Sequence, residues 1–304
     1  MLTAFVPGPS GLEHQQVLPG SAVPEHTVWL DLNSPTPDEE HFVERTLGIE
    51  VPSLDEMREI ESSNRLYEEN GALYMTATLV TQLDTDVAGM RTQVTFILAG
   101  PRLVTNRYAD PLPFRRFIAF AQTHPASCGS AALLLAGLLE AIVNRIADIL
   151  EKVGADVESL STRVFARRSR SHDFREELSQ IGQGGELVSK ARESLVSLQR
   201  LLGFLQQSTN DRLLTPEARA NLRTVSRDVN ALSSHASFLY EKVQFLLDAT
   251  LGMVTIDQNN ILKIFSIVTV LLLPPSIIVG FYGMNFPYVP LMHRAWGYGS
   301  RSAR

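Results

Sequence analysis

The sequence predicts an α/β N-terminal domain followed by long antiparallel helices, the last of which continues as a very long stalk into one transmembrane helix. Three observations predict this fold class. Short strand-like and helix-like runs alternate in the first third, and apolar residues then recur every third or fourth position over long stretches. A charge-free apolar run near the end covers residues 264–281. We therefore expect four segments: the α/β domain 1–125, a long-helix and coiled-coil region with the stalk 126–261, a transmembrane helix 262–284, and an outer loop with the C-terminus 285–304.

The overall composition excludes several classes of protein. The chain has 304 residues, of which 44% are hydrophobic, and its net charge is -6. A negative charge argues against nucleic-acid binding, since nucleic-acid-binding domains usually present a basic face. The single cysteine, Cys128, excludes an intrachain disulfide and a cysteine zinc cage within one chain, and we expect it to be buried as a small hydrophobic residue. Residues 1–11 lack the basic and apolar regions of a secretory signal peptide.

The first third of the chain carries the signals of a small mixed sheet. Ser53 is a predicted helix N-cap, with Glu56 at capping-box spacing. The pair Asn70-Gly71 between two strand-like runs predicts a β-hairpin. The predicted elements are a strand at 27–32, helices at 37–47 and 53–61, hairpin strands at 65–69 and 72–83, and a second strand pair at 91–98 and 102–107.

Two long helices are predicted to follow this domain. The first has apolar residues three or four apart from Leu135 to Val164, which predicts an amphipathic helix of roughly 35 to 40 residues. The second runs from Asp173 to about Gln207, and glycines at positions 182, 184 and 185 weaken it.

The third long helix begins at Pro216, with Thr215 as its N-cap. If it is unbroken to Phe281, it is about 100 Å long, too long for one small domain to bury. It must therefore pack against other helices or other subunits. Its apolar residues step three, four, three, four, which is the heptad seam of such packing: Leu222, Val225, Val229, Leu232, Ala236, Leu239, Val243 and Leu246.

The apolar run 264–281 has the length and composition of a membrane-spanning helix. Continued to Met284, it is roughly 30 Å long, the thickness of a bilayer core. Pro274 and Pro275 remove backbone donors near its middle, and lipid cannot replace the lost hydrogen bonds whereas a protein-lined or watery pore can. Hydroxyl side chains recur on the same run, at Ser266, Thr269 and Ser276. A simple membrane anchor needs none of these features.

Directly after this run the chain reads Tyr282-Gly283-Met284-Asn285. A Gly-Met-Asn tripeptide at the outer end of a proline-containing helix resembles the signature of the CorA family of magnesium transporters. Residues 246–287 resemble the pore helix of that family nearly end to end, and residues 65–76 resemble its N-terminal hairpin. The resemblance covers nearly the whole chain.

The resemblance implies a homopentamer in a lipid bilayer whose pore passes hydrated Mg²⁺. It implies that Gly283, Met284 and Asn285 form the selectivity loop, with the Asn285 carbonyl receiving the hydrated ion. By matching positions, six further residues would line the pore: Asp248, Asn259, Leu262, Phe265, Leu273 and Ser276. The three apolar residues among them would form a constriction that gates by dewetting. Considered without the resemblance, Asp248 also fits a solvated position and Asn259 a polar interface position.

The resemblance also implies a place in the cell and a ligand. We expect the bacterial inner (plasma) membrane, with the N-terminal domain in the cytoplasm. Mg²⁺ is the expected transported ion and a candidate regulatory ligand, and Zn²⁺ or Co²⁺ is the alternative. The sequence contains no P-loop, nucleophile elbow or His-Glu metal motif, so we expect no enzymatic activity and no nucleic-acid partner.

The chain departs from the family pattern after Asn285. The family carries a short acidic outer loop and a second transmembrane helix. Here Leu291 stands where the family usually has a glutamate, and His293 and Arg294 add positive charge. No second apolar run follows Tyr298, so we expect a C-terminally truncated member without the second transmembrane helix. The alternative functions are a transporter of zinc or another divalent cation, and a non-conducting, membrane-anchored helical remnant.

Overall fold

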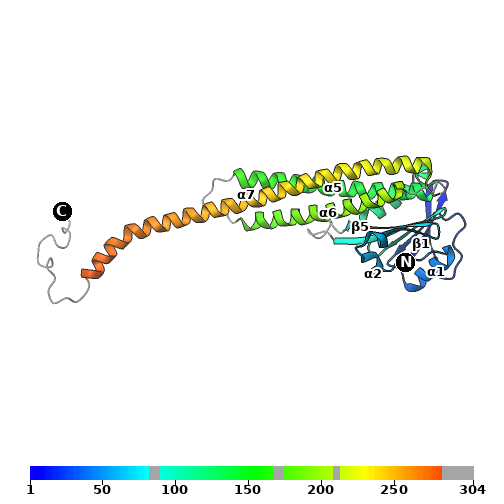
Figure 1. Cartoon of the computed structure of the whole chain (residues 1–304), viewed down its shortest axis with the longest axis horizontal. Coiled ribbons are helices and arrows are strands. Elements are labelled where there is room, and N and C mark those ends of the chain that lie inside the picture. Colours follow the sequence, from blue (N-terminus) through cyan, green and yellow to red (C-terminus); the bar gives the residue numbers. More distant parts are fainter. Residues whose placement is uncertain (82–89, 167–173, 208–212, 283–304) are drawn as a thin grey trace. The chain divides into compact units, whose positions relative to one another are not determined.

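The computed structural model describes residues 1–81, 90–166, 174–207 and 213–282 (Figure 1). The chain divides into two compact units, Met1–Leu247 and Asp248–Arg304. The first unit contains a mixed β-sheet and the helices that cover it. The described part of the second unit is the C-terminal portion of one long helix.

The sheet of the first unit has seven strands in the order β2-β1-β3-β7-β6-β5-β4. Strands β3 and β7 pair in parallel, and all other neighbours in the sheet are antiparallel. The strands are β1 (Leu2–Gly8), β2 (Gly11–Gln16), β3 (Trp29–Asn33), β4 (Leu66–Glu69), β5 (Ala72–Thr81), β6 (Met90–Ala99) and β7 (Arg102–Arg107).

Both predicted strand pairs are confirmed. In the β4–β5 hairpin Glu69 lies opposite Ala72, and the connecting residues Asn70 and Gly71 have φ angles of 50° and 77°. Positive φ at both central residues is what a tight hairpin turn of this hand requires, which explains the Asn-Gly pair. Strands β6 and β7 are joined through Gly100, whose φ is 56°. Strand β3 was predicted from position 27, whereas β1 and β2 were not predicted.

Three short helices cover one face of the sheet: α1 (Pro37–Leu47), α2 (Leu54–Arg58) and α3 (Ser62–Arg65). Thr36 caps α1 and Ser53 caps α2, each in a complete capping box. The helix predicted at 53–61 therefore begins as expected but ends at Arg58. The buried core under this face consists of Leu2, Ala4, Val17, Leu30, Leu32, Val43, Ile49, Val51, Ala72, Tyr74, Ile97 and Val104.

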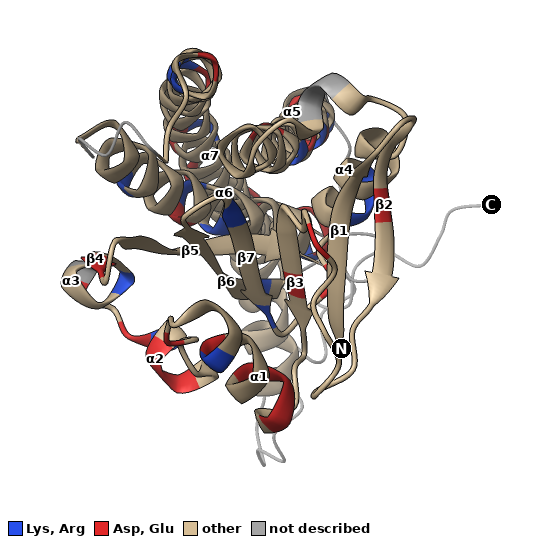
Figure 2. Cartoon of the chain, turned by 90° about the vertical axis from the view of Figure 1, so that its right-hand side faces the viewer, with Lys and Arg blue, Asp and Glu red and all other residues tan. Residues whose placement is uncertain are grey.

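One short and two long helices cover the opposite face of the sheet (Figure 2). They are α4 (Leu112–Ala121), α5 (Ala131–Ala166) and α6 (Arg175–Gln207), with a 3₁₀ turn η1 (Pro125–Cys128) before α5. The core on this side is aromatic, since Trp29 stacks on Phe5 and lies beside Phe114 and Phe117. Cys128 is buried, as predicted. Helix α4 was not predicted.

Helix α7 (Pro216–Tyr282) is unbroken, as the sequence predicts. Within the first unit it runs beside α5 and α6 (Figure 1). The seam residues named above are buried, except for the half-buried Leu232. A Cβ added at Gly154 of α5 would lie 3.6 Å from Leu239, and one added at Gly185 of α6 would lie 3.2 Å from Val243. The seam therefore lies at a helix–helix interface within the chain, and a side chain at Gly185 would crowd Val243.

Helix α6 also contacts the edge of the sheet. Strand β4 pairs with β5 only as far as Met75. Beyond that point the backbone N–H of Thr78 donates a 3.0 Å hydrogen bond to the Ser197 hydroxyl of α6. Arg91 of β6 and Glu193 of α6 form a 2.5 Å ion pair. Helix α6 therefore contacts the sheet through polar side chains as well as through its apolar face.

Candidate functional site

The C-terminal portion of α7, from Asp248 onward, carries most of the predicted site residues. It contains a segment long and apolar enough to cross a membrane, and in the described residues that segment is not buried by the rest of the chain. Leu262 is 62% exposed and Phe265 is 66% exposed. Large apolar side chains in water are unfavourable at about 25 cal/mol per Å². This helix therefore needs lipid or other protein around it.

The six described residues that the resemblance assigns to the pore share one side of this helix. At about 100° per residue, Asp248, Asn259, Leu262, Phe265, Leu273 and Ser276 fall within an arc of about 120°. We call these six residues the candidate arc. The helix brings onto one side residues that are separated by up to roughly eight turns. An arc of this width is what a helix presents to a partner or a channel.

Within the apolar run 264–281, the side of the helix opposite the candidate arc is apolar. Ile267, Leu271 and Ile278 lie at its centre, by the same rotation of about 100° per residue. All three are exposed in the chain. Within the run 264–281 this side is therefore suited to hydrocarbon, whereas the candidate arc carries a carboxylate, an amide and a hydroxyl between its apolar residues.

Each hydroxyl of the apolar run donates a hydrogen bond to the carbonyl one turn earlier. Ser266 donates to Leu262 at 2.9 Å, Thr269 donates to Phe265 at 2.8 Å, and Ser276 donates to Leu272 at 2.8 Å. Such bonds are local, so they let a hydroxyl lie in an apolar segment without an external acceptor. The hydroxyl oxygen keeps its lone pairs free to accept a further hydrogen bond.

The proline pair changes the backbone of the same segment. Helix α7 continues through Pro274 and Pro275, but neither residue has an N–H to donate. The carbonyls of Val270 and Leu271 therefore lose their usual donors four residues ahead. In a bilayer, unsatisfied carbonyls require donors from protein or water.

The remaining predicted site residues, Gly283, Met284 and Asn285, lie outside the described residues, as does the outer segment through position 304. Among the described residues, no group of three or more His, Cys, Asp or Glu side chains could hold a metal ion within one chain. The candidate regulatory Mg²⁺ therefore has no site of that kind in the described part of a single chain.

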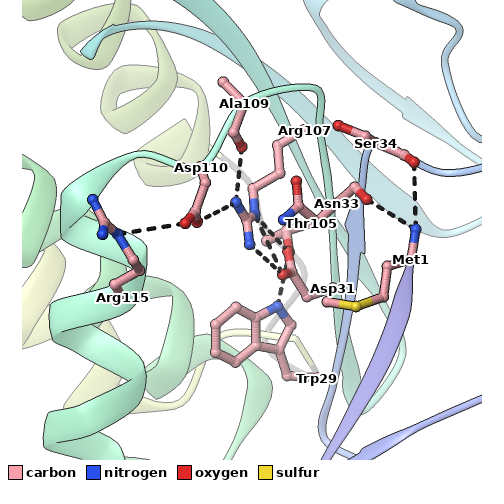
Figure 3. A network of polar contacts seen from close by, with 10 residues as sticks. All are labelled: Met1, Trp29, Asp31, Asn33, Ser34, Thr105, Arg107, Ala109, Asp110 and Arg115. Atoms are coloured by element: carbon pink, nitrogen blue, oxygen red, sulfur yellow. Dashed lines mark hydrogen bonds and ion pairs between the residues drawn. The ribbon is translucent and has the colours of Figure 1, made fainter. Parts of the chain in front are cut away.

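The first unit contains a buried polar network, shown in Figure 3. Arg107 of β7 and Asp31 of β3 form a 2.8 Å ion pair, and each side chain is 4% exposed. Thr105 donates to Asp31 at 2.6 Å, and the Trp29 indole donates to Thr105 at 2.9 Å. Arg107 also donates to Asp110 at 2.8 Å, at the surface end of the network.

Every nitrogen of the Arg107 guanidinium donates to an oxygen of Asp31, Ala109 or Asp110. Burial would lower the pKa of Arg107, but the hydrogen bonds and charges of Asp31 and Asp110 outweigh burial and raise it. The guanidinium also lies over the Phe114 ring, 4.8 Å from its centroid. A network that is satisfied internally in this way joins β3, β7 and α4, and its role is structural.

Sequence reasoning identified the apolar run from its composition and assigned the six residues of the candidate arc through the resemblance, and that assignment stays a prediction. It did not identify the Asp31–Arg107 pair. The two residues are far apart in sequence and meet only because β3 and β7 are adjacent parallel strands with Asp31 opposite Thr105. Nothing in the spacing of the sequence signals that adjacency.

Comparison with known proteins places this architecture in a family. A family model described as CorA-like Mg²⁺ transporter protein matches residues 24–302. The chain is 34% identical over 272 residues to the magnesium transport protein CorA of Haemophilus influenzae, which covers 89% of this chain and 84% of the relative. It is 33% identical over 273 residues to the magnesium transport protein CorA of Escherichia coli, covering 90% of this chain and 85% of the relative.

The fold agrees with the sequence match. The complete structure of the CorA magnesium transporter from Methanocaldococcus jannaschii matches with a TM-score of 0.75 at 20% identity, covering 98% of this chain and 91% of that chain. The predicted order of α/β domain, long helices and a long helix able to span a membrane is confirmed. The chain belongs to the CorA-like Mg²⁺ transporter family.

Proposed function

We propose that the chain is a subunit of a magnesium channel in which α7 crosses the membrane and five copies of its candidate arc surround the pore. The proposal is supported by membership of the family and by the magnesium transport named for its relatives. In this arrangement the opposite side of the helix, with Ile267, Leu271 and Ile278, faces away from the pore.

The selectivity loop 283–285 and the candidate arc each have a chemical role in the proposal. Asn285 accepts hydrogen bonds from the water shell of the entering ion, since Mg²⁺ gives up its waters reluctantly. Gly283 and Met284 form the turn that presents it. Leu262, Phe265 and Leu273 form a constriction that closes the pore when it dewets. Ser276 lies on the outer side of this constriction, and Asn259 and Asp248 lie on the inner side, where a carboxylate ring attracts cations.

One observation carries the proposal: the residues of α7 that the resemblance assigns to the pore also share one side of the helix. The residues assigned by resemblance were chosen by their place in a motif, yet they occupy one arc of about 120°. The residues that form the apolar side lie opposite them. A helix that served only as an anchor would have no reason to separate its residues in this way.

The proposal includes the topology of the whole chain. The protein lies in a bacterial inner membrane with the segment 1–261 in the cytoplasm, where the α/β domain 1–125 and the long helices of 126–261 are well placed to respond to intracellular Mg²⁺. A regulatory ion would be held between subunits, because the described residues of one chain provide no cluster of three or more acidic, histidine or cysteine ligands.

The test is flux into liposomes containing a Mg²⁺ indicator, with the full chain reconstituted after its assembly has been measured by light scattering in detergent. We expect a pentamer and Mg²⁺-dependent uptake. Asn285→Ala should abolish uptake while leaving the assembly intact. A pentamer without uptake would support the non-conducting alternative, and a monomer would count against the channel. Uptake of Zn²⁺ or Co²⁺ in preference to Mg²⁺ would favour the alternative cargo.

Two adjacent asparagines provide a matched test of the arc. Asn259 belongs to the candidate arc, whereas Asn260 lies about 100° away from it. Both are exposed in the chain. We expect Asn259→Ala to change the uptake rate and Asn260→Ala to leave it near the wild-type value. The reverse result would place the pore on a different side of α7.

A further inference from the structure

We propose that Thr269 provides a ring of hydrogen-bond acceptors inside the apolar constriction, at which a hydrated cation is held between the inner and outer ends of the pore. This inference rests on the proposed function, because it requires the candidate arc to face a pore. It assigns a positioning role to a residue outside the six of the arc.

The position of Thr269 follows from the period of the helix. It lies four residues after Phe265 and four residues before Leu273, so it is in the same row of side chains as both. Its direction is near the centre of the candidate arc, by the rotation of about 100° per residue. At 1.5 Å per residue, each of the two apolar residues is roughly 6 Å away along the helix axis. Thr269 therefore lies midway through the apolar stretch between them.

The orientation of its hydroxyl determines what Thr269 offers to the pore. The hydroxyl proton is already donated to the Phe265 carbonyl at 2.8 Å. A threonine oxygen has one proton and two acceptor positions, so this bond leaves the oxygen as an acceptor. The threonine side chain is exposed in the single chain, so the chain itself does not cover the oxygen.

An acceptor fits a hydrated cation better than a donor does. Water bound to Mg²⁺ directs its oxygen to the metal and its hydrogens outward, and the ion keeps that water shell. The outward hydrogens need acceptors, which Leu262, Phe265 and Leu273 cannot supply. One threonine from each subunit would supply a ring of them at the middle of the dry segment. This lowers the cost of passing a hydrated ion through a constriction that otherwise closes by dewetting.

The experiment compares three variants of the full chain in the liposome flux assay. Thr269→Val removes the hydroxyl while keeping the shape, and Thr269→Ser keeps the acceptor. Thr162→Val is the matched control, since the Thr162 hydroxyl on α5 makes the same type of bond, to the Glu158 carbonyl at 3.1 Å. We expect Thr269→Val to slow Mg²⁺ flux at least about fivefold, the order of one hydrogen bond, and Thr269→Ser to stay within about twofold. The control should match wild type.

The outcomes separate this inference from the proposed function. Wild-type protein without Mg²⁺ flux would contradict the proposed channel. Wild-type flux with Thr269→Val unchanged would overturn the acceptor ring and leave the channel standing. Equal losses in Thr269→Val and Thr269→Ser would also overturn it, because they would indicate packing rather than an acceptor.

A second measurement does not depend on flux. In a Cys128→Ala background, Thr269→Cys should react with a water-soluble methanethiosulfonate applied to the reconstituted protein, because the residue contacts the water path. Leu271→Cys, on the opposite side of α7, should not react. Absence of reaction at position 269, or equal reaction at both positions, would overturn the placement of Thr269 in the pore.

Discussion

The two units of the chain differ in where their apolar side chains find partners. In residues 1–247 the sheet and helices enclose their own core, and even the charged pair Asp31–Arg107 is fully hydrogen-bonded inside it. In the described part of the second unit, residues 248–282, the large apolar side chains are exposed. The first unit therefore contains the interactions that stabilise it, whereas the second exposes an apolar surface that needs lipid or other protein around it.

This difference separates two kinds of mutational effect. A substitution in the first unit should change the free energy of unfolding, because the lost contact is within the chain. A substitution on α7 beyond Asp248 should leave that free energy almost unchanged and act on flux or assembly instead. This distinction is wrong if a substitution beyond Asp248 strongly lowers the free energy of unfolding, or if a substitution in the core of the first unit leaves it unchanged.

The largest expected effect is at the buried ion pair. Arg107→Met leaves Asp31 charged, buried and without its main partner, which should cost about 3–5 kcal/mol of unfolding free energy. The measurement is denaturant unfolding of the full chain in detergent, followed by the fluorescence of the buried Trp29 in a Trp296→Phe background. The matched control is Arg115→Met, since Arg115 pairs with Asp110 at the surface, at 3.4 Å, and exposed pairs are worth about 0–1 kcal/mol. Equal costs for the two variants would contradict the structural role assigned to the network.

A pair of leucines on α7 tests the division between the units directly. Leu239 is 3% exposed and packs beside Gly154 of α5, whereas Leu271 is 73% exposed. Leu239→Ala should cost about 2–5 kcal/mol of unfolding free energy, because it removes buried methyl groups and leaves a cavity. Leu271→Ala, measured in the same denaturant assay, should change it by less than about 0.5 kcal/mol. A large cost at Leu271 would show that this helix has a partner within its own chain.

The sequence predicted the long helices well because their stabilising contacts are periodic. The seam from Leu222 to Leu246 repeats at the heptad spacing, and the structure buries those positions except for the half-buried Leu232. The Asn70-Gly71 hairpin and the Ser53 capping box were predicted because each depends on residues close together in sequence. The six residues of the candidate arc came from the resemblance, and the helical period shows only that they share one side of α7.

The elements that the sequence analysis did not predict, β1, β2 and α4, lack such local signals. Strand β1 is buried on both sides through its first four residues, so its pattern has no alternation. Strand β2 lies at the edge of the sheet and is mostly polar and exposed. Helix α4 is short and follows a proline. Strands β1 and β2 pair with each other as a hairpin, but neither has the alternating apolar pattern by which a strand is recognised from a single sequence.

The smallest expected effect concerns the glycines of α6, which the sequence presented only as weak points in a helix. Gly182 has nothing within 4 Å of an added Cβ, so Gly182→Ala should stabilise the chain by about 0.5–1 kcal/mol through helix propensity alone. Gly185→Ala brings the same propensity gain, but its Cβ would lie 3.2 Å from Val243 of α7. That contact is tighter than ordinary van der Waals distance, so crowding should offset part or all of the gain. Denaturant midpoints of the two variants should therefore differ, with Gly182→Ala the more stable. Equal stabilisation would mean that α7 can move away from Gly185 at no cost, and that this glycine is not needed for the packing of Val243 against α6.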